Sequence, residues 1–334
     1  MKPSSEVLRQ YASVHTDLAL EAHAAAVKTD WDRQGVHVET EDFPGGTVSR
    51  VQVLDARGAA RMGKPPGNYI TIEAPGLREH DVELREQVSQ VLAREVASLL
   101  PQQDKSGATL VVGLGNWHVT PDSLGPLVIE ELLVTRHLFE YAPEHVDDGM
   151  RSVCAIAPGV LGITGIETGD VISGVVQKVQ PNAIIAVDAL AARSIDRLGT
   201  TIQIADTGIS PGSGVGNKRH ALNRETLGVP VIAIGTPSVV YANTIVLDAM
   251  QKLTESVREA AGAQANVGGL WRNSSLEEQG QLVHEVLSPF WGNLVVAPKE
   301  CDEQIRQLSK VIAGGLNVAL QPGLATSDTL RYLQ

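Results

Sequence analysis

The feature that most constrains the fold is a pair of apolar runs, each leading to an aspartate. The first run, TLVV at 109–112, ends at Gly113, and the segment GLGNWHVTPDSLGP (113–126) then carries Asp122 to the start of an apolar helical pattern. The second run, AIIAV at 183–187, leads directly into Asp188. Such short apolar runs are typical of buried parallel strands, and open α/β sheets build their ligand sites where these strands end. We therefore expect the two acids to face each other across the carboxyl edge of one sheet.

Strand-like and helix-like patterns alternate along the rest of the chain, which predicts an α/β fold. Alternating or β-branched runs predict the strands, and apolar residues at helical spacing predict the helices. The segment 57–68 is rich in Gly and Pro and is predicted to be a loop. We expect three layers, with a mostly parallel sheet covered by helices on both faces. The predicted strands are 48–54, 69–74, 109–113, 183–187, 201–205, 230–234 and 293–297, and the helices are 81–100, 123–137, 166–179, 238–258 and 302–320.

The length and composition are those of a chain that can bury one large core. The chain has 334 residues, of which 43% are hydrophobic and only 4% are aromatic. The core must therefore consist mainly of aliphatic side chains, as in most parallel sheets. We expect a single α/β domain over residues 18–334, in which the polar, Gly-rich segment 259–282 is a surface excursion.

Charge and cysteine content exclude several classes of function. The net charge is −12 and no long run of Lys or Arg occurs, so we expect no direct binding to nucleic acid. No segment approaches the roughly 18 apolar residues of a membrane helix, and the N-terminus lacks the apolar stretch of a secretory signal. Cys154 and Cys301 lie far apart and lack the paired spacing of zinc or redox sites. These observations predict a cytoplasmic location and no contact with membranes.

Three long segments resemble the germination protease family in the right order. These are GLGNWHVTPDSLGP at 113–126, QPNAIIAVDALAARS at 180–194 and TTIQIADTGISPGSGVGNKR at 200–219. Members of that family are endopeptidases that degrade small acid-soluble spore proteins when bacterial spores germinate. The segment VHTDLALEA at 14–22 is similar to the family's self-processing site. The resemblance implies a zymogen with a propeptide over residues 1–17, cut between Asp17 and Leu18. It also implies a homotetramer located in the spore core.

Two carboxyl groups can cleave a peptide without a nucleophilic side chain. One, ionised, removes a proton from water, and the other, protonated, polarises the carbonyl or protonates the leaving amine. The resemblance places the two catalytic aspartates of the family at Asp122 and Asp188. The structural alternative for each is an acid that caps the following helix.

Three nearby features are interpreted as supporting the site. Asp206 lies in Asp-Thr-Gly, the tripeptide of pepsin-like proteases. Those enzymes need two such loops in two β-rich lobes, or one in a small dimeric β chain, whereas this chain has one in an α/β context. His118 is the one histidine inside a motif loop, either as a hydrogen-bonded loop residue or as a metal ligand. The Gly-rich loop 210–219 fails the phosphate-loop template. Its Lys218 and Arg219 are either solvated charges or contacts for acidic residues of a substrate.

Two further functions are left open by the residues. In the hydrogenase-maturation endopeptidases, strand-end acids surround a metal, so Asp122 and Asp188 would be metal ligands in that alternative. A non-catalytic α/β binding module would use the same acids and glycines to hold a ligand. Such a module, however, has no reason to carry a protease-like sequence near residue 17. We therefore predict a self-processing aspartic-type endopeptidase that needs no cofactor, with small acid-soluble spore proteins as its substrates.

Overall fold

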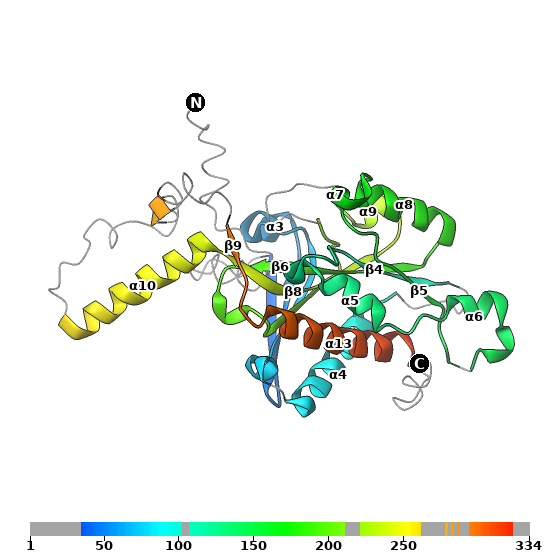
Figure 1. Ribbon diagram of the computed structural model, residues 1–334, viewed down its shortest axis with the longest axis horizontal. Coiled ribbons are helices and arrows are strands. Elements are labelled where there is room, and N and C mark those ends of the chain that lie inside the picture. The colour runs from blue at the N-terminus through cyan, green and yellow to red at the C-terminus, as the bar shows by residue number, and fades with distance from the viewer. Residues whose placement is uncertain are drawn as a thin grey trace.

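The protein is built around one nine-stranded mixed sheet with the strand order β1-β2-β3-β7-β8-β6-β4-β5, and β9 pairs with β8 (Figure 1). The computed structural model describes residues 35–79, 81–101, 107–147, 149–210, 221–261 and 294–322, and a few helical positions between 278 and 286. The strands are β1 Val36–Phe43, β2 Gly46–Val53, β3 Gly67–Glu73, β4 Thr109–Gly113, β5 Val153–Ile156, β6 Ala183–Ala192, β7 Thr201–Ala205, β8 Val231–Tyr241 and β9 Val295–Val296.

The core of the sheet is parallel, and its flanks are antiparallel. Strands β5, β4, β6 and β8 run parallel to one another. The remaining pairs, β1–β2, β2–β3, β3–β7, β7–β8 and β8–β9, are antiparallel. The carboxyl ends of β4, β6 and β8 therefore meet at one edge, as expected for a site built on parallel strands.

Helices cover both faces of the sheet, which confirms the α/β class. One face packs on α4, α5 and α13 through side chains such as Val111 and Ile185, whereas their neighbours Leu110 and Ile184 face the layer that contains α8 (Figure 1). This division follows from the alternation of side chains along a strand. The helices are α3 Ala56–Met62, α4 Val82–Leu99, α5 Leu124–Glu130, α6 Arg136–Tyr141, α7 Leu161–Thr164, α8 Thr168–Val179, α9 Arg224–Leu227, α10 Ala242–Ala261 and α13 Cys301–Leu320, with short 3-10 turns η2 Pro75–Arg78, η3 Thr120–Asp122, η4 Pro143–His145 and η5 Ile195–Arg197.

The two long helices α4 and α13 pack together beneath the sheet. The N-terminus of α4 is capped by Asp81, whose side chain accepts a hydrogen bond from the Leu84 amide. Gly315 of α13 lies so close to α4 that an added Cβ would be 2.8 Å from Leu92 Cδ2 and 2.8 Å from the Ser89 carbonyl oxygen. Glycine at this position thus allows the closest approach of the two helices. None of the helices in the described part of the chain combines the length and apolar character that a bilayer crossing requires.

The loop predicted for residues 57–68 contains a helix, so that prediction is wrong for its first half. Helix α3 begins after Asp55, whose side chain accepts hydrogen bonds from the amides of Arg57 and Gly58. It ends at Gly63, which has φ of 62°. An N-cap aspartate and a left-handed C-cap glycine are sufficient to delimit a short helix.

The helix predicted over 123–137 is interrupted. Helix α5 ends at Glu130 and α6 begins at Arg136. Asn317 of α13 binds the intervening segment, because its Oδ1 accepts from the Leu133 amide at 2.8 Å and its Nδ2 donates to the Glu131 carbonyl at 3.1 Å. These bonds join residues far apart in sequence, so the local apolar pattern could not predict the break.

Two strands are longer than their apolar runs. Strand β6 continues through Asp188 to Ala192, and β8 continues to Tyr241, so the helix expected from residue 238 begins at Ala242. The two extensions pair with each other, with a register shift between Leu190 and Ala191. Asp188 consequently lies inside a strand and not at its end, which corrects the sequence interpretation. Strands β1 and β5 were not predicted.

Candidate active site

The loop after β4 returns on itself and delivers Asp122 to the edge of the sheet. The Asn116 amide donates to the Asp122 carbonyl at 2.9 Å, and the Asp122 amide donates to the Val119 carbonyl at 2.8 Å. Gly115 has φ of +116°, and an added Cβ would lie 2.0 Å from the Asp122 carbonyl oxygen. Glycine is required at this turn because both its backbone conformation and its contact exclude a side chain. The loop thereby holds the short turn η3, which ends at Asp122, in one position.

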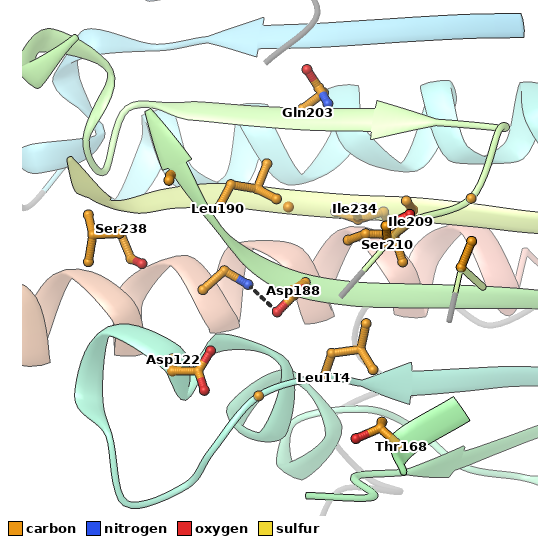
Figure 2. A pocket seen from close by; sticks show the side chains of 18 of the residues that line it. Leu114, Asp122, Thr168, Asp188, Leu190, Gln203, Ile209, Ser210, Ile234 and Ser238 are labelled. Carbon is orange, nitrogen blue, oxygen red and sulfur yellow. Dashed lines mark hydrogen bonds between the residues drawn. The ribbon is translucent and has the colours of Figure 1, made fainter. Parts of the chain in front are cut away.

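Asp188 occupies the neighbouring strand β6. The Leu114 amide, just after β4, donates to the Val187 carbonyl at 2.8 Å and so ties the Asp122 loop to this strand. The Asp188 side chain is 8% exposed, and its Oδ1 accepts a hydrogen bond from the Ala189 amide at 2.9 Å (Figure 2). Asp122 is more accessible, since it is only half-buried. Figure 2 shows the two aspartates on adjacent elements that border the same space.

Both aspartates line one cavity of about 740 Å³. This volume is typical of a ligand pocket and can hold several residues of a peptide. Among the described residues that line it, three carry a charge, namely Lys64, Asp122 and Asp188. The rest of the wall is mostly apolar or uncharged, including Leu114, Thr168, Leu190, Gln203, Ile209, Ile234 and Ser238 (Figure 2). The cavity therefore combines a pair of carboxyl groups with an apolar lining.

Asp206 connects two strands beside the cavity. Its carboxylate accepts hydrogen bonds from the Asn68 amide at 2.8 Å and from Asn68 Nδ2 at 2.6 Å, and so holds β3 against the end of β7. Its neighbour Thr207 lines the cavity, whereas Asp206 is not among the lining residues. Burial raises the pKa of Tyr69, the hydrogen bond with Thr207 lowers it, and the negative charge of Asp206 raises it further. These contacts fit the supporting role that the sequence predicts for Asp206.

The other predicted supporting residues have different outcomes. His118 is exposed, and its backbone amide donates to Asn116 Oδ1 at 2.9 Å. It is not among the residues that line the cavity, although Val119 beside it is. Lys218 and Arg219 lie outside the described residues, as do Asp17 and Leu18.

Several lining residues were not found from the sequence. Lys64 lies within the predicted loop 57–68, and no motif marks it. Gln203 and Ser238 are largely buried polar residues on β7 and β8. The alternation of a strand can indicate that such a residue faces one side of a sheet, but only the strand order shows that this side borders the aspartates.

The described residues do not supply a complete metal site near the aspartates. No group of three or more His, Cys, Asp or Glu side chains suited to holding a metal ion occurs in the described ranges. A catalytic zinc ion usually takes three protein ligands, and Asp122 and Asp188 provide two carboxylates. Within the described ranges, the donor set is therefore incomplete for a metal site of that kind.

Comparison with known proteins decides the family. The family model described as Germination protease matches residues 13–266 and 251–333. The chain belongs to the germination protease family. A germination protease of Caldanaerobacter subterraneus subsp. tengcongensis is 51% identical over 320 residues, covering 96% of this chain and 98% of its own length. Those of Clostridium acetobutylicum and Bacillus cereus are 47% and 44% identical, each over 96% of this chain and 99% and 97% of their own lengths.

Membership of the germination protease family confirms the resemblance carried by the three motif segments. The chain is a protease, which hydrolyses peptide bonds, and the process in which it acts is spore germination. The matched ranges include both aspartates that line the cavity.

Proposed function

We propose that this germination protease is an endopeptidase that starts the degradation of small acid-soluble spore proteins, and that Asp122 and Asp188 activate the attacking water. The observation that carries the proposal is the position of the two aspartates. They come from separate parts of the chain and line one peptide-sized cavity at the edge of the parallel core. Its largely apolar wall would limit the access of water to the reacting groups and strengthen their electrostatic interactions.

The reaction needs one proton shared between two carboxyl groups. The ionised carboxylate removes a proton from a water molecule as the water oxygen attacks the peptide carbonyl carbon. The protonated carboxyl group donates its proton to the carbonyl oxygen, which gives a tetrahedral diol. The first carboxyl group then passes the proton taken from water to the leaving nitrogen as the carbon–nitrogen bond breaks, and the second recovers its proton from a diol hydroxyl as the acid product forms. The amide of Ala189 orients the Asp188 carboxylate through the 2.9 Å hydrogen bond, and the closed loop before Asp122 orients the other.

The remaining parts of the proposal concern maturation and assembly. Residues 1–17 form a propeptide that the enzyme removes by cutting between Asp17 and Leu18, where an acid is followed by an apolar residue and Ala. The mature enzyme is a homotetramer in the spore core. Lys218 and Arg219, which follow the cavity-lining residues 207–210 in the sequence, contact acidic residues of the substrate.

The proposal is tested with isosteric variants of the two aspartates. Asp122→Asn and Asp188→Asn retain the shape of the side chain but remove the ionisable group, so each should lower kcat/KM at least about a hundredfold. The substrate is a synthetic peptide with the sequence of residues 14–22, and its products are separated by chromatography. Circular dichroism and thermal unfolding show whether each variant is folded.

Asp42→Asn is the matched control, because Asp42 is exposed on β1, far from β6 in the strand order. It should cleave the peptide at the wild-type rate. Near-wild-type cleavage by a folded Asp122→Asn or Asp188→Asn variant would show that the pair is not catalytic.

A further inference from the structure

Exposed apolar side chains border the cavity on two separate segments. Trp117 and Val119 lie on the loop between β4 and η3. Leu161, Ile163 and Ile166 lie on α7 and directly after it. We call these five residues the apolar rim. All are at least 40% exposed, and Ile163 reaches 56%.

The apolar rim is continuous with the cavity that holds the aspartates. Val119 belongs to the rim and also lines the cavity. On the other segment, Val160 and Gly162 line the cavity and alternate with the exposed Leu161 and Ile163. A bound polypeptide that extends out of the cavity along either segment therefore contacts apolar side chains directly.

The two sequence segments that carry the apolar rim contain no acidic residue, lysine or arginine. The chain has a net charge of −12, and 20% of its residues are charged. No Asp, Glu, Lys or Arg occurs from residue 152 to 166, nor from residue 108 to 121. Contiguous exposed apolar surface on a soluble protein usually marks an interaction site. Apart from His118 and Cys154, these two stretches offer no ionisable side chain, so they favour a partner recognised through its apolar side chains.

The backbone of α7 leaves space for such a partner. A Cβ added to Gly162 would meet no atom within 4 Å, although this residue lines the cavity. Gly165, with φ of +69°, likewise has open space around it. The two glycines thus leave open space beside the exposed aliphatic side chains of Leu161 and Ile163.

We infer that the apolar rim is a substrate-docking surface that binds aliphatic or aromatic side chains of the polypeptide outside the scissile bond. The inference rests on the proposed function. The rim selects a class of substrate, namely an extended chain with apolar residues on either side of the cleaved bond. Continuity with the cavity favours the substrate over other occupants, because Val119 of the rim also lines the cavity that holds the aspartates. The rim increases the affinity for long substrates and contributes little to short ones.

The test compares peptides that differ only in their outer residues. The short peptide has the sequence of residues 14–22, and the long peptide that of residues 8–28. A third, matched to the long one, carries Leu8→Ser, Tyr11→Ser and Val27→Ser. The wild-type enzyme should show kcat/KM about tenfold higher for the long peptide than for its Ser-substituted form, since burial of apolar side chains supplies the difference.

Variants of the apolar rim should reduce this preference. Ile163→Ser and Trp117→Ser should lower the ratio of the two kcat/KM values to about two or less. Gly162→Trp should lower it as well, because the new side chain fills the open space. Val82→Ser is the matched control: Val82 is 74% exposed at the start of α4, on the opposite face of the sheet, and its loss should leave the ratio unchanged.

A binding measurement separates the docking surface from the proposed chemistry. In the Asp188→Asn background, fluorescence anisotropy of a labelled long peptide should show a Kd about tenfold higher when Ile163→Ser is added. This result can be obtained even if the aspartates are not catalytic. An unchanged Kd and an unchanged kcat/KM ratio in folded rim variants would overturn the inference. A lower molecular mass of Ile163→Ser in sedimentation would also overturn it, because the rim would then join copies of this chain.

Discussion

Gly125 at the start of α5 lies directly against the carbonyl group of Val187 in β6. A Cβ added to Gly125 would be 2.6 Å from the Val187 oxygen and 2.3 Å from the Leu114 oxygen. Both atoms belong to the backbone, so neither can rotate away as a side chain would. This contact brings the segment that contains Asp122 next to the strand that contains Asp188. The candidate site can therefore form only if residue 125 has no side chain.

The first prediction concerns this contact. Gly125→Ala should lower the free energy of unfolding by about 2 kcal/mol or more, because the new methyl group forces α5 away from the strands. Cleavage of the peptide of residues 14–22 should fall at the same time, since Asp122 moves with α5. Urea unfolding and peptide cleavage at a temperature where the variant is folded measure the two effects.

Gly174→Ala provides the comparison. Gly174 lies inside α8, and an added Cβ would meet no atom within 4 Å. Alanine there should raise the free energy of unfolding by about 1 kcal/mol, because it favours the helix. If both substitutions were tolerated equally, the close approach at Gly125 would have no role in placing the site.

The second prediction separates Asp206 from the catalytic pair. Asp206→Asn replaces one acceptor oxygen by a donor, opposite the two N–H donors of Asn68, and should lower the free energy of unfolding by about 1–2 kcal/mol. Peptide cleavage should fall less than tenfold, because the side chain supports the cavity wall without lining it. Kinetic and unfolding measurements on the same preparation check both. An inactive, folded Asp206→Asn beside an active Asp188→Asn would identify Asp206 as the partner of Asp122.

The third prediction concerns metal ions. Prolonged treatment with EDTA should leave peptide cleavage unchanged, because the derived reaction uses the carboxyl groups alone. Elemental analysis of the treated protein establishes that it is free of metal. Loss of activity with EDTA and its return on addition of a defined divalent ion would favour the hydrogenase-maturation type of mechanism.

The fourth prediction concerns the N-terminus. Purified precursor should cut itself between Asp17 and Leu18, because a polar terminal segment can reach the site of its own or another copy. Mass spectrometry during storage or mild acidification should show a new N-terminus at Leu18. The Asp188→Asn variant should remain unprocessed alone and should be cut when active wild-type enzyme is added. A different mature N-terminus, or equal processing in the variant alone, would contradict the proposed propeptide.

The elements that could be predicted are those whose pattern is local. Strand β4 was predicted at its observed bounds because a short apolar run is typical of a strand buried on both faces. Helices α4 and α13 were predicted within one residue at each end because their apolar residues recur at helical spacing. The extension of β6 beyond Asp188 was missed because it depends on pairing with the extension of β8. The end of α5 was missed because Asn317, on another helix, binds the segment that follows it.

The sequence by itself determined the α/β class and the protease family and nominated the two aspartates, since these are carried by apolar patterns and by contiguous motifs. Only the tertiary structure decided that Asp122 and Asp188 line the same cavity, that Asp206 holds Asn68 beside it, and that exposed apolar residues border its opening. The reason is physical. Strand order, close backbone approaches and solvent exposure arise from contacts between residues far apart in the chain, and no local pattern contains them.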